Sequence, residues 1–257
     1  MKKHKISLPI KLVISGITII VALLFIIGYL AVALQNLDYF KIKDIAVNRP
    51  EGAFDFSELL GRNIFRIDLK KESRYITELY PVYKNIRLFR ILPNRLFIGF
   101  TDRNPLAYVK LYRYFCVDSD LALFELPQGQ EAWDLPVIIG LERKIPGPRP
   151  GKRYNIKELI TALNIIKEIE TNSLFKKYKI ERIDITNPAN ISCFISRLDY
   201  SNVQAAADFQ VLEVKVGQDD ISDKFRVLAG LFTQLKDDIS NIKYIDLRFK
   251  EPVVKFK

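Results

Sequence analysis

The stretch "ILPNRLFIGFTDRNPLAYV", Ile91 to Val109, predicts a turn, a strand and a break in quick succession. Pro93-Asn94 favours a tight turn, because proline fixes φ and asparagine tolerates left-handed backbone. Apolar residues then alternate with a period of two, which predicts a strand over Arg95–Thr101. Asn104-Pro105 breaks that strand, and a second one is expected from Leu106. One face of the first strand carries Leu96, Ile98 and Phe100. The pattern is typical of a structural corner, not of a catalytic loop.

Upstream of this corner the pattern predicts a small α+β domain in the order β-α-α-β-β. The second of its helices begins at an N-capping Asp68 and ends before Pro81, with Leu69, Ile76 and Leu79 as its apolar stripe. The first helix is short and ends near Gly61, a residue type that is common just after a helix. The remaining elements are strands at Tyr39–Val47, which carries an irregularity, Val82–Phe89 and Arg95–Thr101.

Downstream of the corner the pattern predicts a strand-rich domain with two amphipathic helices. The first helix runs from Ile156 to Asn172, with apolar residues at helical spacing. The second is expected to be capped by Ser222 and to turn Phe225, Leu228, Phe232 and Leu235 inward. Strands are expected at Leu106–Asp118, Leu121–Leu126, Leu135–Gly140, Ile180–Ile185, Ile191–Leu198 and Phe209–Val216, and two more lie in "IKYIDLRFKEPVVKFK" at the end of the sequence.

An uncharged run of 23 residues, Leu12–Leu34, precedes both domains. As a helix it reaches about 35 Å, enough to cross a hydrocarbon core of about 30 Å. Lysines precede it, which predicts that the residues before the run stay in the cytoplasm. The alternative is a cleaved signal peptide ending at "AVA", Ala31–Ala33, but the apolar run is longer than a signal sequence needs. Both interpretations place the remainder outside the cytoplasm.

Composition excludes several classes of function. The single histidine, His4, lies before the apolar run, which removes histidine-dependent catalysis and zinc binding from the folded region. Four of the 40 basic residues lie before the apolar run, and the remaining 36 basic and 30 acidic residues carry a net charge of +6. This mild excess indicates a solvated face near an anionic membrane, with a peptidoglycan contact as the alternative, and not a nucleic-acid partner. Cys116 and Cys193 are expected to be buried free thiols, with a disulfide as the alternative. We expect no cofactor and no metal.

Two acidic residues in "CVDSDLALF", Asp118 and Asp120, admit two interpretations. They are a candidate pair for acid-base chemistry or for a calcium ion. Because strands are expected on both sides, a hairpin turn explains them more simply.

Taken in order, the motifs "NIFRIDL", "ILPNRLFIGFTDRNPLAYV", "CVDSDLALF", "LPVIIG", "VLEVKVG" and "IDLRF" resemble those of the FtsQ/DivIB cell-division family. The resemblance covers essentially the whole chain. It implies a cytoplasmic tail at 1–11, a transmembrane helix at 12–34, a POTRA domain at 39–102 and the β domain of the family at 103–257. One departure is Leu121, where the family usually has glycine after the hairpin aspartate.

The resemblance implies a non-enzymatic scaffold in the cytoplasmic membrane at the division septum. Its partners would be FtsB-like and FtsL-like single-pass proteins and other division components, linked to septal wall synthesis. The alternative is an extracytoplasmic sensor or an enzyme of wall metabolism, acting through Asp118, Asp120 or Asp184. The last strand is expected to be an open edge, with Ile245, Leu247 and Phe249 on one face of its neighbour and with Val254 and Phe256 inward. The partner-binding residues expected there are Arg248, Phe249, Glu251, Pro252, Val253, Val254, Lys255 and Phe256.

Overall fold

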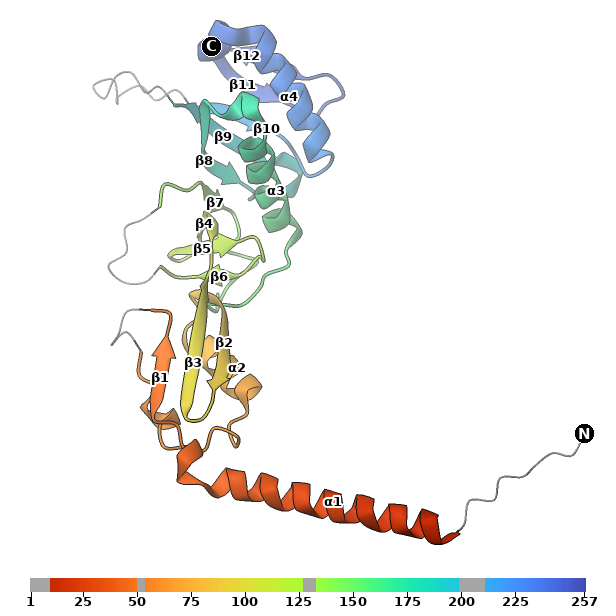
Figure 1. Cartoon of the computed structure of the whole chain (residues 1–257). Helices are drawn as coiled ribbons and strands as arrows, with labels where there is room; N and C mark the ends of the chain where they lie inside the picture. Colours follow the sequence, from red (N-terminus) through yellow and green to blue (C-terminus); the bar gives the residue numbers. More distant parts are fainter. Residues whose placement is uncertain (1–9, 50–53, 127–132, 199–210) are drawn as a thin grey trace, which may run out of the picture. The chain divides into compact units, whose positions relative to one another are not determined.

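The computed structural model describes residues 10–49, 54–126, 133–198 and 211–257 (Figure 1). Its described residues divide into two compact units. The first unit extends to Tyr80 and includes Asn85–Thr101; the second comprises Pro81–Lys84 and the chain from Asp102 onward. The short segment Pro81–Lys84 therefore belongs with residues that follow it by about twenty positions or more in the sequence. The domain limits expected from the sequence stay predictions.

Helix α1, Ile10–Asn36, contains the expected span 12–34. Within it, Ile14–Asn36 is long and apolar enough to cross a membrane, and none of that window is buried against the protein. The lysines expected to flank its start at positions 2, 3 and 5, and His4, lie outside the described residues.

A three-stranded sheet in the order β1-β3-β2 forms the centre of the first unit. Strand β1 runs parallel to β3, with Asp44 opposite Arg95. The alternation read from the sequence is confirmed, since Leu96, Ile98 and Phe100 are all buried. The elements are η1 Asp38–Phe40, β1 Asp44–Val47, η2 Ser57–Leu59, α2 Leu69–Leu79, β2 Tyr83–Ile91 and β3 Arg95–Asp102.

Two local expectations for the first unit need correction. The first short helix is a single 3₁₀ turn, η2, because the Asp55 carboxylate accepts the Ser57 N–H and Gly61 already takes a φ of 75°. In α2 the cap is as expected, with Asp68 accepting the N–H groups of Lys70 and Lys71. Leu79, however, is 54% exposed, because it lies in the last turn and lines a surface cavity.

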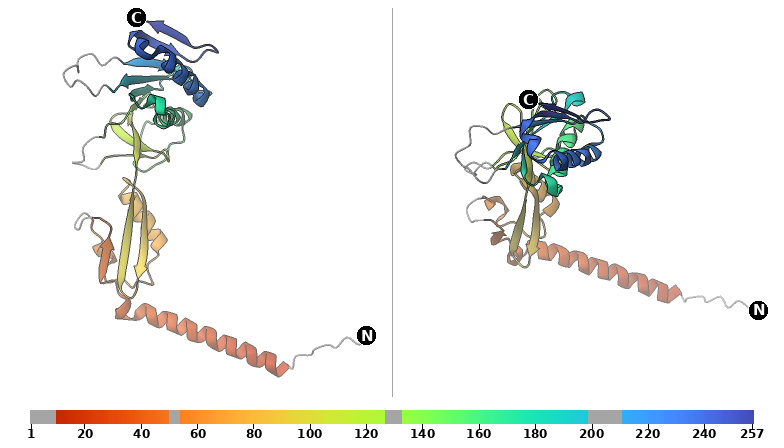
Figure 2. Two further views of the ribbon diagram at one scale, coloured as in Figure 1. Left: turned by 45° about the horizontal axis from the view of Figure 1, so that its top comes forward. Right: turned by 90° about the horizontal axis from the view of Figure 1, so that it is seen from above.

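The second unit is built on a nine-stranded sheet in the order β12-β11-β10-β9-β8-β7-β4-β5-β6. Its helices α3 and α4 lie on one face of the sheet (Figure 2). The strands are β4 Pro105–Lys110, β5 Tyr114–Asp118, β6 Leu123–Phe124, β7 Val137–Ile139, β8 Tyr178–Asp184, β9 Ser192–Arg197, β10 Leu212–Lys215, β11 Ile242–Asp246 and β12 Val253–Phe256. The helices are α3 Lys157–Thr171, η3 Ser173–Phe175, η4 Pro188–Asn190, α4 Ile221–Leu235 and η5 Lys236–Asn241.

One row of side chains on the helix-covered face runs across eight of these strands in register. It consists of Val254, Ile245, Val214, Cys193, Ile183, Ile138, Val109 and Phe115. All of them except Val254, in the last strand, are at most 1% exposed. A row of this kind fixes the register of each strand, because a slip by one residue would turn it toward solvent.

Three expectations in the second unit are wrong: one concerns a helix cap and two concern the placement of phenylalanine side chains. Ser222 does not cap α4; the helix starts one residue earlier, and the Ser222 hydroxyl donates to Glu168. Phe249 is 61% exposed, because β11 ends at Asp246 and the chain turns there. Phe256 is 50% exposed, since it lies in the end strand with no further strand beyond it among the described residues.

Gly140 provides the first testable prediction. Its φ is 102°, and a Cβ there would lie 2.4 Å from the Thr186 backbone nitrogen. Gly140→Ala is therefore expected to lower the free energy of unfolding by about 2 kcal/mol or more, since left-handed strain and a backbone clash combine. The matched control is Gly217→Ala, which has a φ of 72° but only ordinary contacts around it, and should cost about 1 kcal/mol. Urea titration of the full chain in detergent micelles measures both, and equal losses would contradict this account.

Candidate functional site

Strand β12 ends the nine-stranded sheet, and no other described strand lies beyond it. It pairs with β11 in antiparallel register, with Asp246 opposite Val253 and Ile245 opposite Val254. The residues expected to bind a partner all lie in this strand or in the connection Leu247–Pro252 that leads to it. The structure thus brings them together along one edge.

The direction of the backbone groups of β12 follows from a single hydrogen bond. The N–H of Lys257 donates to the carbonyl of Asn241, on the β11 side, at 3.0 Å. In an antiparallel pair, successive residues direct their N–H and C=O groups alternately toward and away from the partner strand. Residues 253, 255 and 257 therefore face β11, whereas Val254 and Phe256 direct both groups outward. Pro252 precedes them without an N–H, as is usual at the start of an edge strand.

The side chains of this edge are largely apolar and exposed. Phe249 is 61% exposed, Phe256 is 50% exposed and Val253 is 46% exposed. Val254 is half-buried and packs against the core of the second unit. An open strand edge with apolar side chains above and below it is the surface that strand addition uses.

A bidentate ion pair holds the connection between β11 and β12. The Arg248 guanidinium donates to both carboxylate oxygens of Asp246, at 2.9 and 2.6 Å, and also to the amide oxygen of Asn190 at 2.8 Å. Asp246 in turn accepts the backbone N–H of Arg248 at 3.0 Å. Hydrogen bonding by Arg248 lowers the pKa of the Asp246 carboxyl below its usual range, so the pair stays ionised at neutral pH.

This ion pair changes the role expected for Arg248. Arg248 is among the residues expected from the sequence to contact a partner, but its guanidinium is already bonded to Asp246 and Asn190. Asn190 comes from η4, 58 positions earlier, and nothing in the sequence pointed to it. The contact of Arg248 with Asp246 could have been suspected from the sequence, because Asp246 stands two residues before this arginine at the end of a strand.

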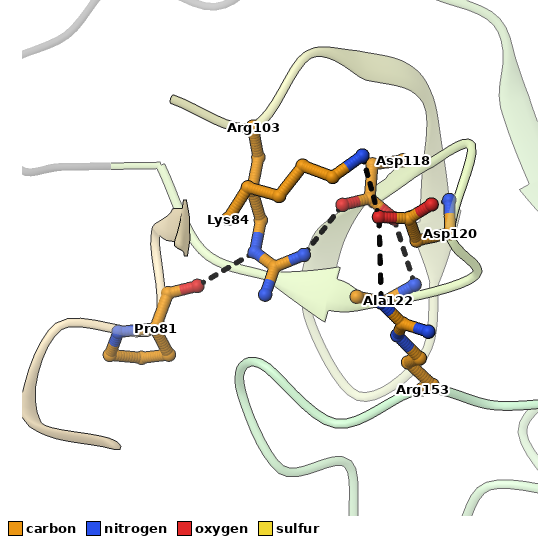
Figure 3. A network of polar contacts seen from close by, with 7 residues as sticks. All are labelled: Pro81, Lys84, Arg103, Asp118, Asp120, Ala122 and Arg153. Carbon is orange, nitrogen blue, oxygen red and sulfur yellow. Dashed lines mark hydrogen bonds and ion pairs between the residues drawn. The ribbon is translucent and has the colours of Figure 1, made fainter. Parts of the chain in front are cut away.

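Asp118, the first of the two candidate acids, is a buried structural group (Figure 3). One of its carboxylate oxygens accepts the N–H groups of Asp120 and Ala122, and the other accepts Arg103 at 2.6 Å. Arg103 also donates to the Pro81 carbonyl at 3.0 Å, which ties Pro81–Lys84 to the second unit. The turn between β5 and β6 is thus closed by Asp118, as the hairpin interpretation expects.

The same turn explains how leucine replaces glycine at position 121. Leu121 adopts a φ of 61°, the left-handed value for which glycine is usually required. Its N–H donates to the Asp118 carbonyl at 3.1 Å, and its side chain packs against the core. The turn therefore keeps a left-handed residue at this position.

Asp120 lies beside two cations and does not have the raised pKa of a catalytic acid. Its carboxylate lies 2.7 Å from the Lys84 ammonium and 3.6 Å from the Arg153 guanidinium (Figure 3). The hydrogen bond and charge of Lys84 lower its pKa, with smaller contributions from Arg153 and Arg103. A carboxyl poised to donate a proton near neutral pH needs the opposite shift.

Asp184, the third candidate acid, is the last residue of β8 and lies toward the opposite ends of the strands from Asp118. Asp118 is opposite Pro105, the first residue of β4, whereas Asp184 is opposite Ile139, the last residue of the parallel strand β7. The structure therefore does not pair these carboxylates. Across residues 10–49, 54–126, 133–198 and 211–257, no three metal-ligating side chains gather.

Both cysteines are free and buried. Cys193 lies in the core row, and Cys116 lies in β5 opposite Phe124. Burial raises the pKa of the Cys116 thiol to about 12 and raises that of Cys193 as well. At neutral pH both remain thiols, which are poor nucleophiles and poor metal ligands.

The apolar helix, the two α+β units and the open edge define a single-helix membrane protein with an unpaired strand at the end of its described sheet, and comparison with known proteins identifies its family. Residues 107–248 match the family described as "Cell division protein FtsQ/DivIB, C-terminal". This match covers more than half of the chain and ends at residue 248, within the connection between β11 and β12. The chain belongs to the FtsQ/DivIB cell-division family.

Individual relatives agree with this assignment. The chain is 26% identical over 223 residues to the cell division protein FtsQ of Syntrophotalea carbinolica, covering 84% of this chain and 74% of the relative. It is 27% identical to FtsQ of Geotalea daltonii over 68% of this chain and 58% of the relative. It is 23% identical to FtsQ of Koribacter versatilis over 76% and 52%. The chain thus spans only about half the length of the last two relatives.

The two acids of the β5–β6 turn provide the second testable prediction. Asp118→Asn is expected to lower the free energy of unfolding by about 3 kcal/mol, because the Arg103 side chain, only 7% exposed, loses its counter-charge. Asp120→Asn, at a partly exposed site, should cost about 1 kcal/mol or less. Denaturant titration of the full chain in micelles measures both.

A double variant serves as the control for this pair. Adding Arg103→Met to Asp118→Asn removes the unpaired charge, so part of the lost stability should return. Similar losses for Asp118→Asn and Asp120→Asn, or no recovery in the double variant, would show that the ion pair does not stabilise this turn.

Proposed function

We propose that this chain is a non-enzymatic scaffold of the division machinery that accepts a β-strand from an FtsB-like partner along β12. The outward backbone groups of Val254 and Phe256, at the end of the sheet, support this proposal most directly. The site comprises Arg248, Phe249, Glu251, Pro252, Val253, Val254, Lys255 and Phe256. Membership of the FtsQ/DivIB family supports a place among division proteins.

Backbone hydrogen bonds would provide the first part of the affinity. An added strand would pair with the N–H and C=O groups of Val254 and Phe256 and with the Pro252 carbonyl, which extends the sheet without altering its core. Each such hydrogen bond adds about 1 kcal/mol net. The pairing requires an extended, ordered edge, and the Asp246–Arg248 ion pair helps to hold the connection in place.

Exposed side chains would provide the second part of the affinity and also the specificity for the partner. Phe249 and Phe256 are the largest apolar groups at the edge, and buried aromatic anchors are worth about 2 kcal/mol each or more in interfaces. Arg248 acts within the chain by orienting the connection. The exposed Lys255 is therefore the cation that we assign to an acidic residue of the partner.

The membrane position of this scaffold follows from α1. We assign the N-terminus to the cytoplasm and both folded units to the outer side of the cytoplasmic membrane, at the septum. There the scaffold would join FtsB-like and FtsL-like single-pass proteins to septal wall synthesis. The structural roles of Asp118 and Asp120 and the protonated thiols are consistent with a protein that binds and does not catalyse.

A proline substitution in the edge strand provides the third testable prediction. Val254→Pro removes one outward N–H and leaves the ladder to β11 intact, so the affinity for an FtsB-like extracytoplasmic segment should fall about tenfold or more. Val254→Thr keeps the N–H and the β-branched shape and should bind like the parent chain. Isothermal titration calorimetry measures both. Equal affinities for the two variants would rule out strand addition at β12.

Two further variants test the side chains of the same site. Deletion of Pro252–Lys257, and Phe249→Glu, should each abolish recruitment of the partner while the first unit stays folded. Leu79→Glu, which changes an exposed residue of α2, is the control. If both edge variants recruit the partner normally, the site lies elsewhere.

Membrane topology provides the fourth testable prediction. Protease added to spheroplasts should digest the chain beyond about Gln35, because the two folded units are accessible from outside. A tag fused after Lys257 should disappear at the same rate. A tag that resists digestion until the membrane is dissolved would reverse the proposed orientation.

A further inference from the structure

The end of α1 is bonded directly to the folded part of the first unit. The Asn63 side chain donates from Nδ2 to the Leu34 carbonyl at 3.2 Å, and Arg66 donates from Nη2 to Asn36 Oδ1 at 2.7 Å. Leu34 lies inside Ile14–Asn36, the candidate membrane span. If that span crosses a bilayer, Asn63 and Arg66 lie at its boundary whatever angle the helix takes.

Two other segments reach the same end of the unit. The 3₁₀ turn η1 begins two residues after α1 ends. The N–H of Lys43 donates to the Asn94 carbonyl at 2.9 Å, which places the β2–β3 turn beside the residues that follow η1 (Figure 1). Since β1 and β3 run parallel, their first residues, Asp44 and Arg95, also meet here.

Each of these three segments exposes an apolar side chain. Tyr39 in η1 is 62% exposed, Leu92 at the β2–β3 turn is 59% exposed, and Phe65 is 36% exposed. In water the exposure of apolar surface is unfavourable. At the boundary of a bilayer the same side chains are favourable, and tyrosine is enriched there because its hydroxyl stays hydrated.

Cations accompany these apolar groups. Lys43 and Lys41 lie between η1 and β1, and Arg66 lies beside the end of α1. Lys41 is paired with Asp38 at 2.7 Å, whereas Lys43 and Arg66 form no ion pair with a carboxylate among the described residues of this end. Long basic side chains at a membrane boundary reach the lipid phosphates while their methylene groups stay on apolar surface.

We propose that η1, the Asn63–Arg66 loop and the β2–β3 turn form a lipid-contacting surface of the first unit. Tyr39, Phe65 and Leu92 enter the interfacial layer of the bilayer, and Lys43 and Arg66 contact lipid phosphates. The inference rests on the proposed function only in requiring that α1 spans the membrane. It gives the first unit several attachments to the bilayer besides the helix, which fixes its height above the lipid.

Tryptophan fluorescence tests this surface, because the chain has one tryptophan, Trp133. In a Trp133→Phe background, Leu92→Trp and Tyr39→Trp each place a reporter at the proposed surface. The full chain is reconstituted into vesicles of phosphatidylcholine and phosphatidylglycerol that contain lipids brominated near the headgroup end of the acyl chain. Both reporters should show blue-shifted emission and lose intensity, whereas Tyr75→Trp, on the exposed side of α2, should do neither.

A reporter inside the span separates failure of this inference from failure of the proposed function. Phe25→Trp, in the middle of α1, should be quenched by lipids brominated near the terminal methyl. If Phe25→Trp is quenched while Leu92→Trp and Tyr39→Trp behave like Tyr75→Trp, the lipid-contacting surface is overturned and the span stands. If Phe25→Trp is not quenched, both are overturned.

The charge requirement is tested with the same reporters. Adding Lys43→Gln to Leu92→Trp should weaken quenching in vesicles that contain phosphatidylglycerol and leave it unchanged in phosphatidylcholine alone. Quenching that is equal with and without the lysine in both vesicles would overturn the assignment of Lys43 to lipid phosphates.

Discussion

One row of buried side chains, from Val254 in β12 to Phe115 in β5, holds the second unit together. Each strand that contributes to it must keep its register, because a slip by one residue would move its core side chain to the other face of the sheet. The helices α3 and α4 bury the row from one side with their own apolar stripes. At the far end of the row, Val254 is only half-buried, which anchors β12 by its side chain while leaving its outer backbone groups accessible.

The open edge therefore exists because the buried row ends at β12, the last described strand of the sheet. A sheet that does not close into a barrel must end in a strand whose outer N–H and C=O groups have no strand partner. Here the last strand is short, follows a proline and carries one lysine with a second just after it, features that discourage indiscriminate pairing. Asp246 and Arg248 hold the connection before it, so the edge is ordered in advance, and a partner strand loses less entropy on binding than it would on a flexible segment.

Buried polar groups elsewhere in the chain have a structural purpose. Arg103 joins the carboxylate of Asp118 to the carbonyl of Pro81, so a residue that precedes β2 is fixed to the turn after β5. In the first unit, the buried Asn63 amide donates to the Leu34 carbonyl and joins the end of α1 to the loop that follows η2. In both places a polar side chain satisfies a backbone or charged group that would otherwise be left without a partner, which is the usual condition for burying one.

The α+β class, the apolar helix and most strands were predictable from the sequence, because hydrophobic periodicity records which face of an element is buried. The family was recognisable for the same reason, through an ordered set of strand and turn motifs. Side-chain partners were not predictable in this way. Arg248 meets Asn190 across 58 positions, and Arg103 meets Pro81 across 22, distances at which local patterns carry no information. The open last strand was expected, but periodicity placed Phe256 inward although it is 50% exposed, because periodicity does not show how far a core extends toward the end of a sheet; only the tertiary structure decides that.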